Sequence, residues 1–304
     1  MQTSEVVSLK TDSDPIAASH TLDMASAVST LPGAFAGENF DLLRVTTPTI
    51  TPVNTPVNAR RRTDDDQLDL TIVVPCFNEE SNIAATLDTV AAAMQELPWS
   101  YEVLVVDDGS SDRTVAVVER YLHQHLDFPI RLHKNPCNRG LTRSYVDGAF
   151  LGRGKYYRLV CGDNVEPKET LVKVFGALGA ADMIIPFHQA VEGKSAFRRQ
   201  LSQTYTTFVN ILSGYHVRYY NGMAAHLRYN VMRWGPYSFG FGFQAELITR
   251  LLDEGATYQE IPVVAIHHEK GGSNSAVNVR NYLSVAHTLL EVFIRRVRRR
   301  TFQK

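Results

Sequence analysis

The chain has 304 residues, 44% of them hydrophobic, and its formal net charge at pH 7 is −1. This length suits one sizeable domain with appendages, and the near-zero charge gives no general electrostatic basis for binding nucleic acid. Its three cysteines, Cys76, Cys137 and Cys161, show no paired spacing, which argues against a disulfide framework or a zinc site and favours a reducing compartment. No apolar run reaches the roughly 18 residues of a membrane-spanning helix, and no secretory signal pattern is present, so a cytoplasmic protein is expected.

The first part of the chain, residues 1–67, is rich in Ser, Thr, Pro, Ala and Asp, and its apolar residues show no sustained period. The stretch 46–56, with the sequence TTPTITPVNTP, is typical of an extended linker. A short helix over 16–28 is compatible with the sequence. We expect residues 1–67 to be a largely disordered N-terminal segment.

From residue 70 onward, short apolar and β-branched runs alternate with helical patterns. The runs that predict strands are 70–75, 103–106, 130–133, 157–160 and 183–186. The patterns that predict helices begin at Ser81 or lie over 114–122, within 138–150 and over 169–178. This alternation predicts an α/β fold with a mostly parallel sheet and helices on both faces. Ligands of such sheets bind beyond the carboxyl ends of the strands, so site residues are expected there.

The second half of the chain is less regular. Helices are expected over 197–212 and 243–252, followed by a strand over 258–266 that Pro262 interrupts. The last element is a long amphipathic helix over 279–297. The predicted organisation is therefore a disordered segment of residues 1–67, one α/β domain of residues 68–278, and a C-terminal amphipathic helix with a basic tail, residues 279–304.

The C-terminal helix combines apolar residues with a basic cluster, RRVRRR, at 295–300. Such a combination is typical of a helix that lies on the surface of an anionic membrane. A core helix with a solvated basic tail is the alternative. We expect the protein to contact the inner face of a membrane peripherally, and the alternative stays open.

Polar and acidic residues follow three of the predicted strands, as PCFNEE at 75–80, DDGSSD at 107–112 and CGDN at 161–164. Helix capping accounts for one or two of these groups. It does not account for Asp107 and Asp108, which directly follow the apolar run VLVV, because buried carboxylates are costly unless they bind something. The sequence therefore predicts a ligand site at this edge of the sheet.

The motifs VPxFNEE at 74–80, VDDGSxD at 106–112 and NRGL at 138–141, in this order and spacing, resemble family 2 glycosyltransferases. Polyprenyl-phosphate mannose and glucose synthases are among the nearest relatives in that family, and the resemblance covers about residues 70–290. It implies a GT-A fold, with a nucleotide-binding half and an acceptor half in one domain. It also implies inverting transfer of a hexose from a UDP- or GDP-sugar.

The resemblance implies roles for residues of these motifs in binding the donor. Pro75, Phe77 and Glu79 would form the wall beside the base, and Asp108 would bind base or ribose hydroxyls. The other residues implied to bind the donor are Asp107, Arg139, Gly140, His268 and Lys270. The last two stand near the position where the relatives carry an arginine that contacts the diphosphate, before a Gly-x-Ser-Lys motif that here ends in Asn274.

The resemblance also implies a divalent cation, because Cys161-Gly162-Asp163 lies where the family usually has Asp-x-Asp to hold Mg²⁺ or Mn²⁺ against the diphosphate. Asp163 keeps the second carboxylate, whereas the thiol of Cys161 is a poor ligand for such cations. Three interpretations remain: a cation bound by one carboxylate and the donor, action without metal, or lost activity. We favour the first, with Asp163 as metal ligand and catalytic residue.

On the acceptor side, the resemblance implies that Arg198 lies on a helix facing the acceptor, where its guanidinium suits a phosphate. Gln244 and Glu246 stand where the family has its acceptor-side helix start. Glu246 would act as general base for a hydroxyl acceptor, and a structural ion pair is the alternative role. A phosphate acceptor is already a nucleophile and needs no base.

The implied function is transfer of a hexose to a membrane-associated acceptor, either a polyprenyl phosphate or a lipid-linked glycan. The alternative is a non-catalytic protein that binds nucleotide-sugars or acts as a scaffold, and Cys161 is its best support. A nucleotidyltransferase is a weaker alternative, because residues 75–80 do not form a glycine-rich, basic phosphate loop.

Overall fold

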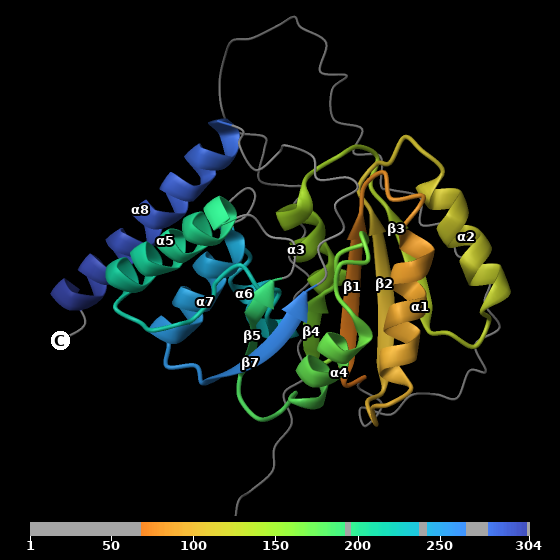
Figure 1. The fold of residues 1–304 in the computed structure, drawn as a ribbon, viewed down its shortest axis with the longest axis horizontal. Coiled ribbons are helices and arrows are strands. Elements are labelled where there is room, and N and C mark those ends of the chain that lie inside the picture. The colour runs from red at the N-terminus through yellow and green to blue at the C-terminus, as the bar shows by residue number, and fades with distance from the viewer. Residues whose placement is uncertain (1–67, 192–195, 237–241, 266–278, 303–304) are drawn as a thin grey trace, which may run out of the picture. The chain divides into compact units, whose positions relative to one another are not determined.

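The structure is a computed structural model that describes residues 68–191, 196–236, 242–265 and 279–302. The predicted disordered segment, residues 1–67, lies outside the described residues. Among the helices of the described ranges, none combines the length and apolar character needed to cross a bilayer. The described part of the chain forms a sheet covered by helices on both faces (Figure 1).

The sheet has seven strands within the described residues, in the order β3-β2-β1-β4-β6-β5-β7. In chain order they are β1 (Leu70–Cys76), β2 (Tyr101–Asp107), β3 (Ile130–Lys134), β4 (Tyr156–Leu159), β5 (Met183–Val191), β6 (Ala225–Leu227) and β7 (Tyr258–Ala265). Strand β6 runs antiparallel to both of its neighbours, and every other pairing in the sheet is parallel. The predicted mostly parallel sheet is confirmed, and β6 is an element that the sequence pattern did not indicate.

The helices cover the two faces of the sheet in separate groups (Figure 1). They are α1 (Ile83–Met94), α2 (Thr114–Gln124), α3 (Leu141–Leu151), α4 (Lys168–Gly176), α5 (Ala196–Ser213), α6 (Arg228–Arg233), α7 (Phe243–Asp253) and α8 (Val279–Phe302). Helices α1, α2 and α4 pack in one hydrophobic cluster with alternate residues of β1, whereas α3, α5, α6 and α7 pack in a second cluster with Val73 of the same strand. Strand β1 is buried on both faces, which explains its continuous apolar sequence.

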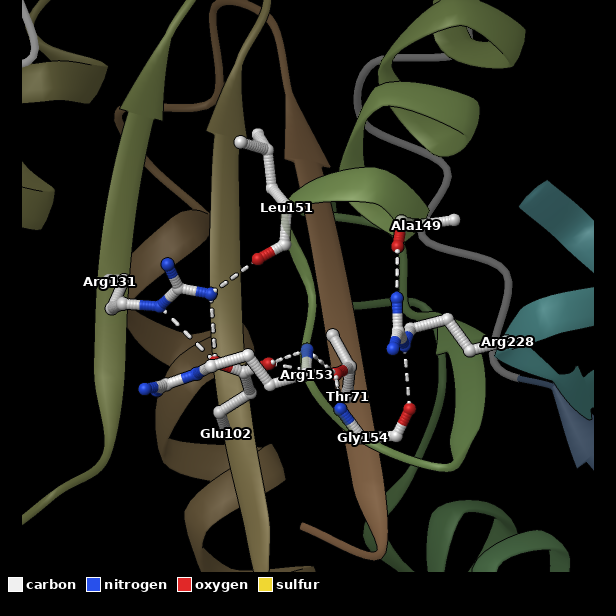
Figure 2. A network of polar contacts seen from close by, with 8 residues as sticks. All are labelled: Thr71, Glu102, Arg131, Ala149, Leu151, Arg153, Gly154 and Arg228. Carbon is white, nitrogen blue, oxygen red and sulfur yellow. Dashed lines mark hydrogen bonds and ion pairs between the residues drawn. The ribbon is translucent and has the colours of Figure 1, made fainter. Parts of the chain in front are cut away.

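A buried polar network joins the amino-terminal halves of β1 and β2, at the end of the sheet opposite the predicted site (Figure 2). Glu102, which is 1% exposed, accepts hydrogen bonds from the Thr71 hydroxyl at 2.8 Å and from Arg131 Nη2 at 2.8 Å. The backbone N–H of Arg153 donates to Glu102 as well. Burial by itself raises the pKa of Glu102, but the arginines and the Thr71 hydroxyl together hold that pKa below its ordinary value.

The same network fixes the connection between α3 and β4 (Figure 2). Arg131 Nη2 donates to the carbonyl of Leu151 at 2.8 Å, and Arg228 Nε donates to the carbonyl of Gly154 at 2.7 Å. These bonds satisfy carbonyl groups of a close connection, where a Cβ on Gly154 would lie 2.3 Å from the backbone nitrogen of Thr71. The orientation of α3, whose other end carries Arg139 and Gly140, is thereby tied to the sheet.

Candidate functional site

The loops that follow β1 and β2 form one hydrogen-bonded unit. Asn78 adopts a left-handed backbone conformation with φ of 58°, and its N–H donates to Ser110 Oγ at 3.0 Å. The Asn78 side-chain oxygen accepts from the N–H of Ser111 at 2.8 Å. The N–H of Glu79 donates to the hydroxyl of Thr114, the first residue of α2, at 2.8 Å. Residues 75–80 and 107–112 are thus brought together at one edge of the sheet.

Asp107 and Asp108 lie at the end of β2 and are 2% and 4% exposed. Asp107 Oδ2 accepts from the N–H of Ser110 at 3.1 Å, while Asp107 Oδ1 is buried without a hydrogen-bond partner among the described residues. An unpaired buried carboxylate oxygen is costly, so this atom marks a position where a bound ligand would supply a donor.

The carboxylate of Asp108 holds the start of α3. Its Oδ1 accepts from Asn135 Nδ2 at 2.8 Å and from the N–H of Arg139 at 3.0 Å, and its Oδ2 accepts from the N–H of Gly140 at 2.8 Å. Gly140 has a φ of 88°, a conformation that suits glycine. The role of Asp108 in binding the base or ribose stays a prediction. The structure adds a second role, in which Asp108 holds the backbone of Arg139 and Gly140, two other predicted donor residues.

The three residues predicted to form the wall beside the base, Pro75, Phe77 and Glu79, differ in exposure. Pro75 is buried in β1, whereas Phe77 directly after the strand is 45% exposed, as a side chain that stacks on a base would be. Glu79 is partly buried, and this burial raises the pKa of Glu79, while a hydrogen bond from Asn82 opposes the rise. The negative charges of Asp163 and Asp112 raise the pKa of Glu79 further.

The thiol of Cys161 precedes Asp163 in the loop after β4. Burial raises the pKa of Cys161 well above its ordinary value, and the negative charges of Asp163 and Glu166 raise it further. The sulfur is therefore a neutral thiol at pH 7, which is a poor cation ligand. Within the described ranges, no group of three or more His, Cys, Asp and Glu side chains is arranged to hold a metal ion. The residues present fit only a cation that receives most of its oxygen ligands from a diphosphate.

Arg158 in β4 positions this loop, and the sequence reasoning missed it. Its side chain is fully buried, and its Nη1 lies 3.2 Å from Glu166 Oε2. Its Nε donates to the Met223 carbonyl at 3.0 Å, and its guanidinium group lies 5.5 Å from the centre of the Phe175 ring. Because Glu166 follows Asp163 by three residues, the ion pair anchors the metal-motif loop to the strand. An arginine inside an otherwise apolar strand was the available signal.

Gln244 and Glu246 lie in the first turn of α7 and are 1% and 2% exposed. Gln244 Oε1 lies 3.3 Å from Nε2 of His226 in β6, and burial lowers the pKa of His226 to about 4, so this imidazole is neutral at pH 7. Glu246 Oε1 lies 3.5 Å from Nη2 of Arg250, one helical turn later. This geometry contains the structural ion pair that the sequence left as the alternative role of Glu246, and its role as a base stays a prediction.

Other predicted site residues fall outside what the structure describes. His268 and Lys270 lie in the segment 266–278, which is outside the described residues. Arg198 belongs to the first turn of α5, but its side chain is outside the described part. The structure therefore brings together the candidates of β1, β2, β4 and the start of α3, and it leaves the expected diphosphate and acceptor-phosphate contacts as predictions.

Comparison with protein families matches the chain to glycosyl transferase family 2 over residues 71–240, which is more than half of the chain. This range includes the ends of β1, β2 and β4 and the start of α3.

Among curated proteins, a dolichyl-phosphate β-glucosyltransferase of Dictyostelium discoideum is 34% identical over 103 residues, which are 32% of this chain and 32% of that protein. A dodecaprenyl-phosphate galacturonate synthase of Rhizobium johnstonii is 33% identical over 120 residues, which are 38% of this chain and 35% of that protein. The chain thus spans about a third of the length of these curated relatives.

Solved structures with a similar fold include a mannosyltransferase from Pyrobaculum calidifontis in complex with GDP-Man and Mn²⁺. It has a TM-score of 0.54 and 21% identity, over 76% of this chain and 65% of that chain. Glucosyl-3-phosphoglycerate synthase from Mycobacterium tuberculosis, in complex with Mn²⁺, UDP and glucosyl-3-phosphoglycerate, has a TM-score of 0.57 and 15% identity, over 74% of this chain and 80% of that chain. The GT-A fold expected from the sequence is confirmed.

Proposed function

The chain belongs to glycosyltransferase family 2, and from this premise we propose that it transfers a hexose from a UDP- or GDP-sugar to a membrane-associated acceptor. The acceptor is a polyprenyl phosphate or a lipid-linked glycan, in keeping with relatives named for dolichyl-phosphate and dodecaprenyl-phosphate chemistry. The observation that carries the proposal is the gathering of acidic motifs from β1, β2 and β4 at one edge of the sheet, with the unpartnered Asp107 Oδ1 among them.

In this proposal, the donor nucleotide lies against the linked loops after β1 and β2. Phe77 offers an exposed ring for the base, and Asp107 Oδ1 accepts a hydrogen bond from a base N–H or a ribose hydroxyl. Arg139 and Gly140, held in place by Asp108, bring the N-terminus of α3 to the same place, and that terminus favours an anionic group.

The diphosphate would lie near Asp163, with Mg²⁺ or Mn²⁺ held mainly by the donor. Such a cation, when bound, offsets the negative charge that develops on the leaving diphosphate. Asp163 supplies one carboxylate, and the buried pair of Arg158 and Glu166 keeps its loop in place. His268 and Lys270, which are outside the described residues, are proposed as further diphosphate contacts.

The transfer itself is a direct displacement with inversion. An acceptor oxygen forms a bond to the anomeric carbon from the face opposite the diphosphate, while the bond between that carbon and the diphosphate oxygen breaks. A phosphate acceptor arrives already ionised, and Arg198 is proposed to orient it. A hydroxyl acceptor must lose a proton, and Glu246 is the proposed base with Gln244 beside it.

The membrane-side surface of this proposal is formed by α5 and α8, which run alongside each other (Figure 1). Large apolar side chains on both helices are exposed to 44–61%, namely Leu201, Phe208, Ile211, Leu290, Phe293, Ile294 and Val297. Arg295 and Arg299 of the basic cluster pair with Asp253, whereas Arg298 and Arg300 are exposed. Exposed apolar residues next to exposed arginines suit the surface of an anionic bilayer, and we propose peripheral attachment at the inner, cytoplasmic face.

The function is tested by incubating the protein with UDP- and GDP-sugars and Mn²⁺ and measuring release of free nucleoside diphosphate, with and without a polyprenyl phosphate. We expect slow release without acceptor and faster release with it. Asp163→Asn should lower release at least about a hundredfold, whereas the exposed Asp127→Asn should change nothing. Tight binding of a nucleotide-sugar with no release under any of these conditions would favour the non-catalytic alternative instead.

A further inference from the structure

A pocket of about 610 Å³ lies between α3, residues 232–236 and Arg250 of α7. It shares Arg139 with the predicted donor residues, and no other residue of its lining is among the predicted donor, metal or acceptor residues. Pockets of roughly 300–1,000 Å³ are the usual size for small-molecule sites. The chemistry of the lining therefore decides what this pocket can hold.

The wall formed by α3 carries an excess of positive charge. Arg139 Nη1 lies 2.7 Å from Asp147 Oδ2, and Arg143 Nε lies 2.9 Å from Asp147 Oδ1. Both guanidinium groups line the pocket, and among the described ion pairs they share this single carboxylate. The pair therefore keeps a net positive charge, and an anion in the pocket would lie against both groups.

The part of the lining formed by residues 232–236 and Arg250 is aromatic and charge-balanced. The guanidinium groups of Arg233 and Arg250 lie 5.3 and 5.1 Å from the centre of the Trp234 ring. Each of them also has a carboxylate partner, Glu254 for Arg233 and Glu246 for Arg250. These contacts hold the indole in place at the pocket, so this wall offers an ordered apolar surface rather than a second anion site.

Two buried polar groups in the lining have no partner among the described residues. Thr142, the second residue of α3, is only 6% exposed, and its hydroxyl makes no hydrogen bond within the described structure. The indole N–H of Trp234 is likewise buried and unpaired there. Buried donors left unpaired in a pocket are costly unless a ligand satisfies them.

We propose that this pocket binds an organic phosphate. The phosphate group would lie between the guanidinium groups of Arg139 and Arg143 and accept a hydrogen bond from Thr142, and the organic part would lie against Trp234 and Phe150. A phosphate suits the site better than a carboxylate, because its oxygens can satisfy two guanidinium groups and a hydroxyl at the same time. The ligand is either the headgroup of an isoprenyl phosphate or a free phosphorylated metabolite.

The position of Trp234 provides a direct test, because the chain has two tryptophans. Trp99 packs in the other hydrophobic cluster, where its indole N–H donates to the Phe175 carbonyl at 2.8 Å, so Trp99→Phe leaves Trp234 as the sole indole. The probes are inorganic phosphate, glycerol 3-phosphate and geranyl phosphate, titrated at constant ionic strength while Trp234 emission is recorded. We expect a saturable change with at least one probe.

Variants made in the Trp99→Phe background locate the binding. Arg143→Ala should weaken the apparent affinity at least tenfold, and Thr142→Val should weaken it severalfold. Arg143→Lys keeps the charge but loses the paired N–H donors of the guanidinium group, so it should also weaken binding severalfold. This variant provides the test if Arg143→Ala does not fold. Arg120→Ala, an exposed arginine of α2 on the opposite face of the sheet, is the matched control and should bind as the parent does.

Tighter binding of geranyl phosphate than of glycerol 3-phosphate would identify the lipid headgroup as the source, and the reverse order would identify a free metabolite. The proposal is overturned if no probe gives a saturable change, or if Arg143→Ala and Arg143→Lys both bind as the parent does. The assay contains no nucleotide-sugar, so its failure and a failure of the proposed transfer reaction are separate results.

Discussion

At the scale of single residues, Asp108 joins the predicted donor site to the start of α3, because its carboxylate accepts from Asn135 and from the N–H groups of Arg139 and Gly140. We predict that Asp108→Ala abolishes binding of UDP and GDP while the protein still folds, at a cost of about 2 kcal/mol in the free energy of unfolding. Calorimetry and urea unfolding measure the two effects. An alanine variant that binds either nucleotide with wild-type affinity would contradict this role.

A second prediction at this scale concerns Asp163 and the cation. Because Cys161 stands in place of a carboxylate and sulfur is a poor ligand for Mn²⁺, this cation should bind weakly to the free protein and much more tightly when UDP or GDP is present. The coupling is reciprocal, so Mn²⁺ must raise nucleotide affinity by the same factor. Cys161→Asp should tighten Mn²⁺ about tenfold or more by restoring an oxygen ligand.

Calorimetric titration of Mn²⁺, with and without nucleotide, measures this coupling in the wild type and in Cys161→Asp. Cys161→Ser is the matched control, since a hydroxyl adds no charge and should leave Mn²⁺ affinity nearly unchanged. If nucleotide binding does not depend on Mn²⁺ in either wild type or Cys161→Asp, Asp163 is not a metal ligand, and side chains such as His268 and Lys270 must offset the diphosphate charge.

At the scale of elements, α8 is anchored to α7 by ion pairs and also exposes apolar side chains, so the sequence's two alternatives for this helix can be tested. Arg295 and Arg299 pair with Asp253 of α7 and anchor the helix, whereas Phe293 and Ile294 are 47% and 44% exposed. We predict that changing Phe293 and Ile294 to Asp lowers partition to anionic vesicles at least about tenfold, because apolar side chains no longer enter the interface.

Co-sedimentation with vesicles containing phosphatidylserine measures this partition. Leu126→Asp is the control, since Leu126 is 78% exposed just beyond α2, and α2 and α8 lie on opposite sides of the described fold (Figure 1). Equal partition of the double variant and the control would show that this face of α8 does not meet the membrane.

At the scale of the whole molecule, a buried polar network and the candidate site lie at opposite ends of the sheet. Glu102 lies at the amino-terminal end with Thr71 and Arg131 and takes no part in the site (Figure 2). We predict that Glu102→Gln lowers the free energy of unfolding at pH 7 by roughly 2 kcal/mol, a moderate value because its arginine partners are half-exposed and can be rehydrated. Nucleotide affinity should stay unchanged.

The pH dependence follows from the lowered pKa of Glu102 in the folded protein. A lowered pKa stabilises the folded state above the ordinary carboxyl pKa of about 4.3, and this stabilisation is lost as the pH falls through the folded value. Urea unfolding from pH 7 to pH 3 should therefore show a smaller acid loss in Glu102→Gln than in wild type. Glu119→Gln, which breaks an exposed pair with Lys134, is the control and should resemble wild type. Parallel curves for wild type and Glu102→Gln would contradict the prediction.

A further prediction at this scale concerns residues 1–67, which carry no family motif and no sustained hydrophobic period. We predict that a chain beginning at residue 68 keeps its turnover of donor, because every described contact of the site is made by later residues. Nucleoside diphosphate release by the full and shortened chains measures this. A shortened chain that keeps its far-UV and near-UV circular dichroism but releases no product would refute it.

The sequence by itself determined the alternation of strands and helices, because a parallel strand buried on both faces requires a continuous apolar run such as 70–75. It also determined where the site would lie, since Asp107 and Asp108 follow such a run and the ends of parallel strands meet at one edge. These features depend on burial and on local periodicity, which a chain displays in its own order of residues.

Only the tertiary structure decided how polar groups are paired over long distances. It paired Asp108 with the N–H groups of Arg139 and Gly140, about thirty residues away, and it buried Arg158 against Glu166. It also inserted the short antiparallel strand β6, and it assembled the pocket between α3, residues 232–236 and α7. A side chain's burial leaves a periodic trace in the sequence, but the identity of its hydrogen-bond partner depends on which segments the fold brings together, and that leaves no local pattern.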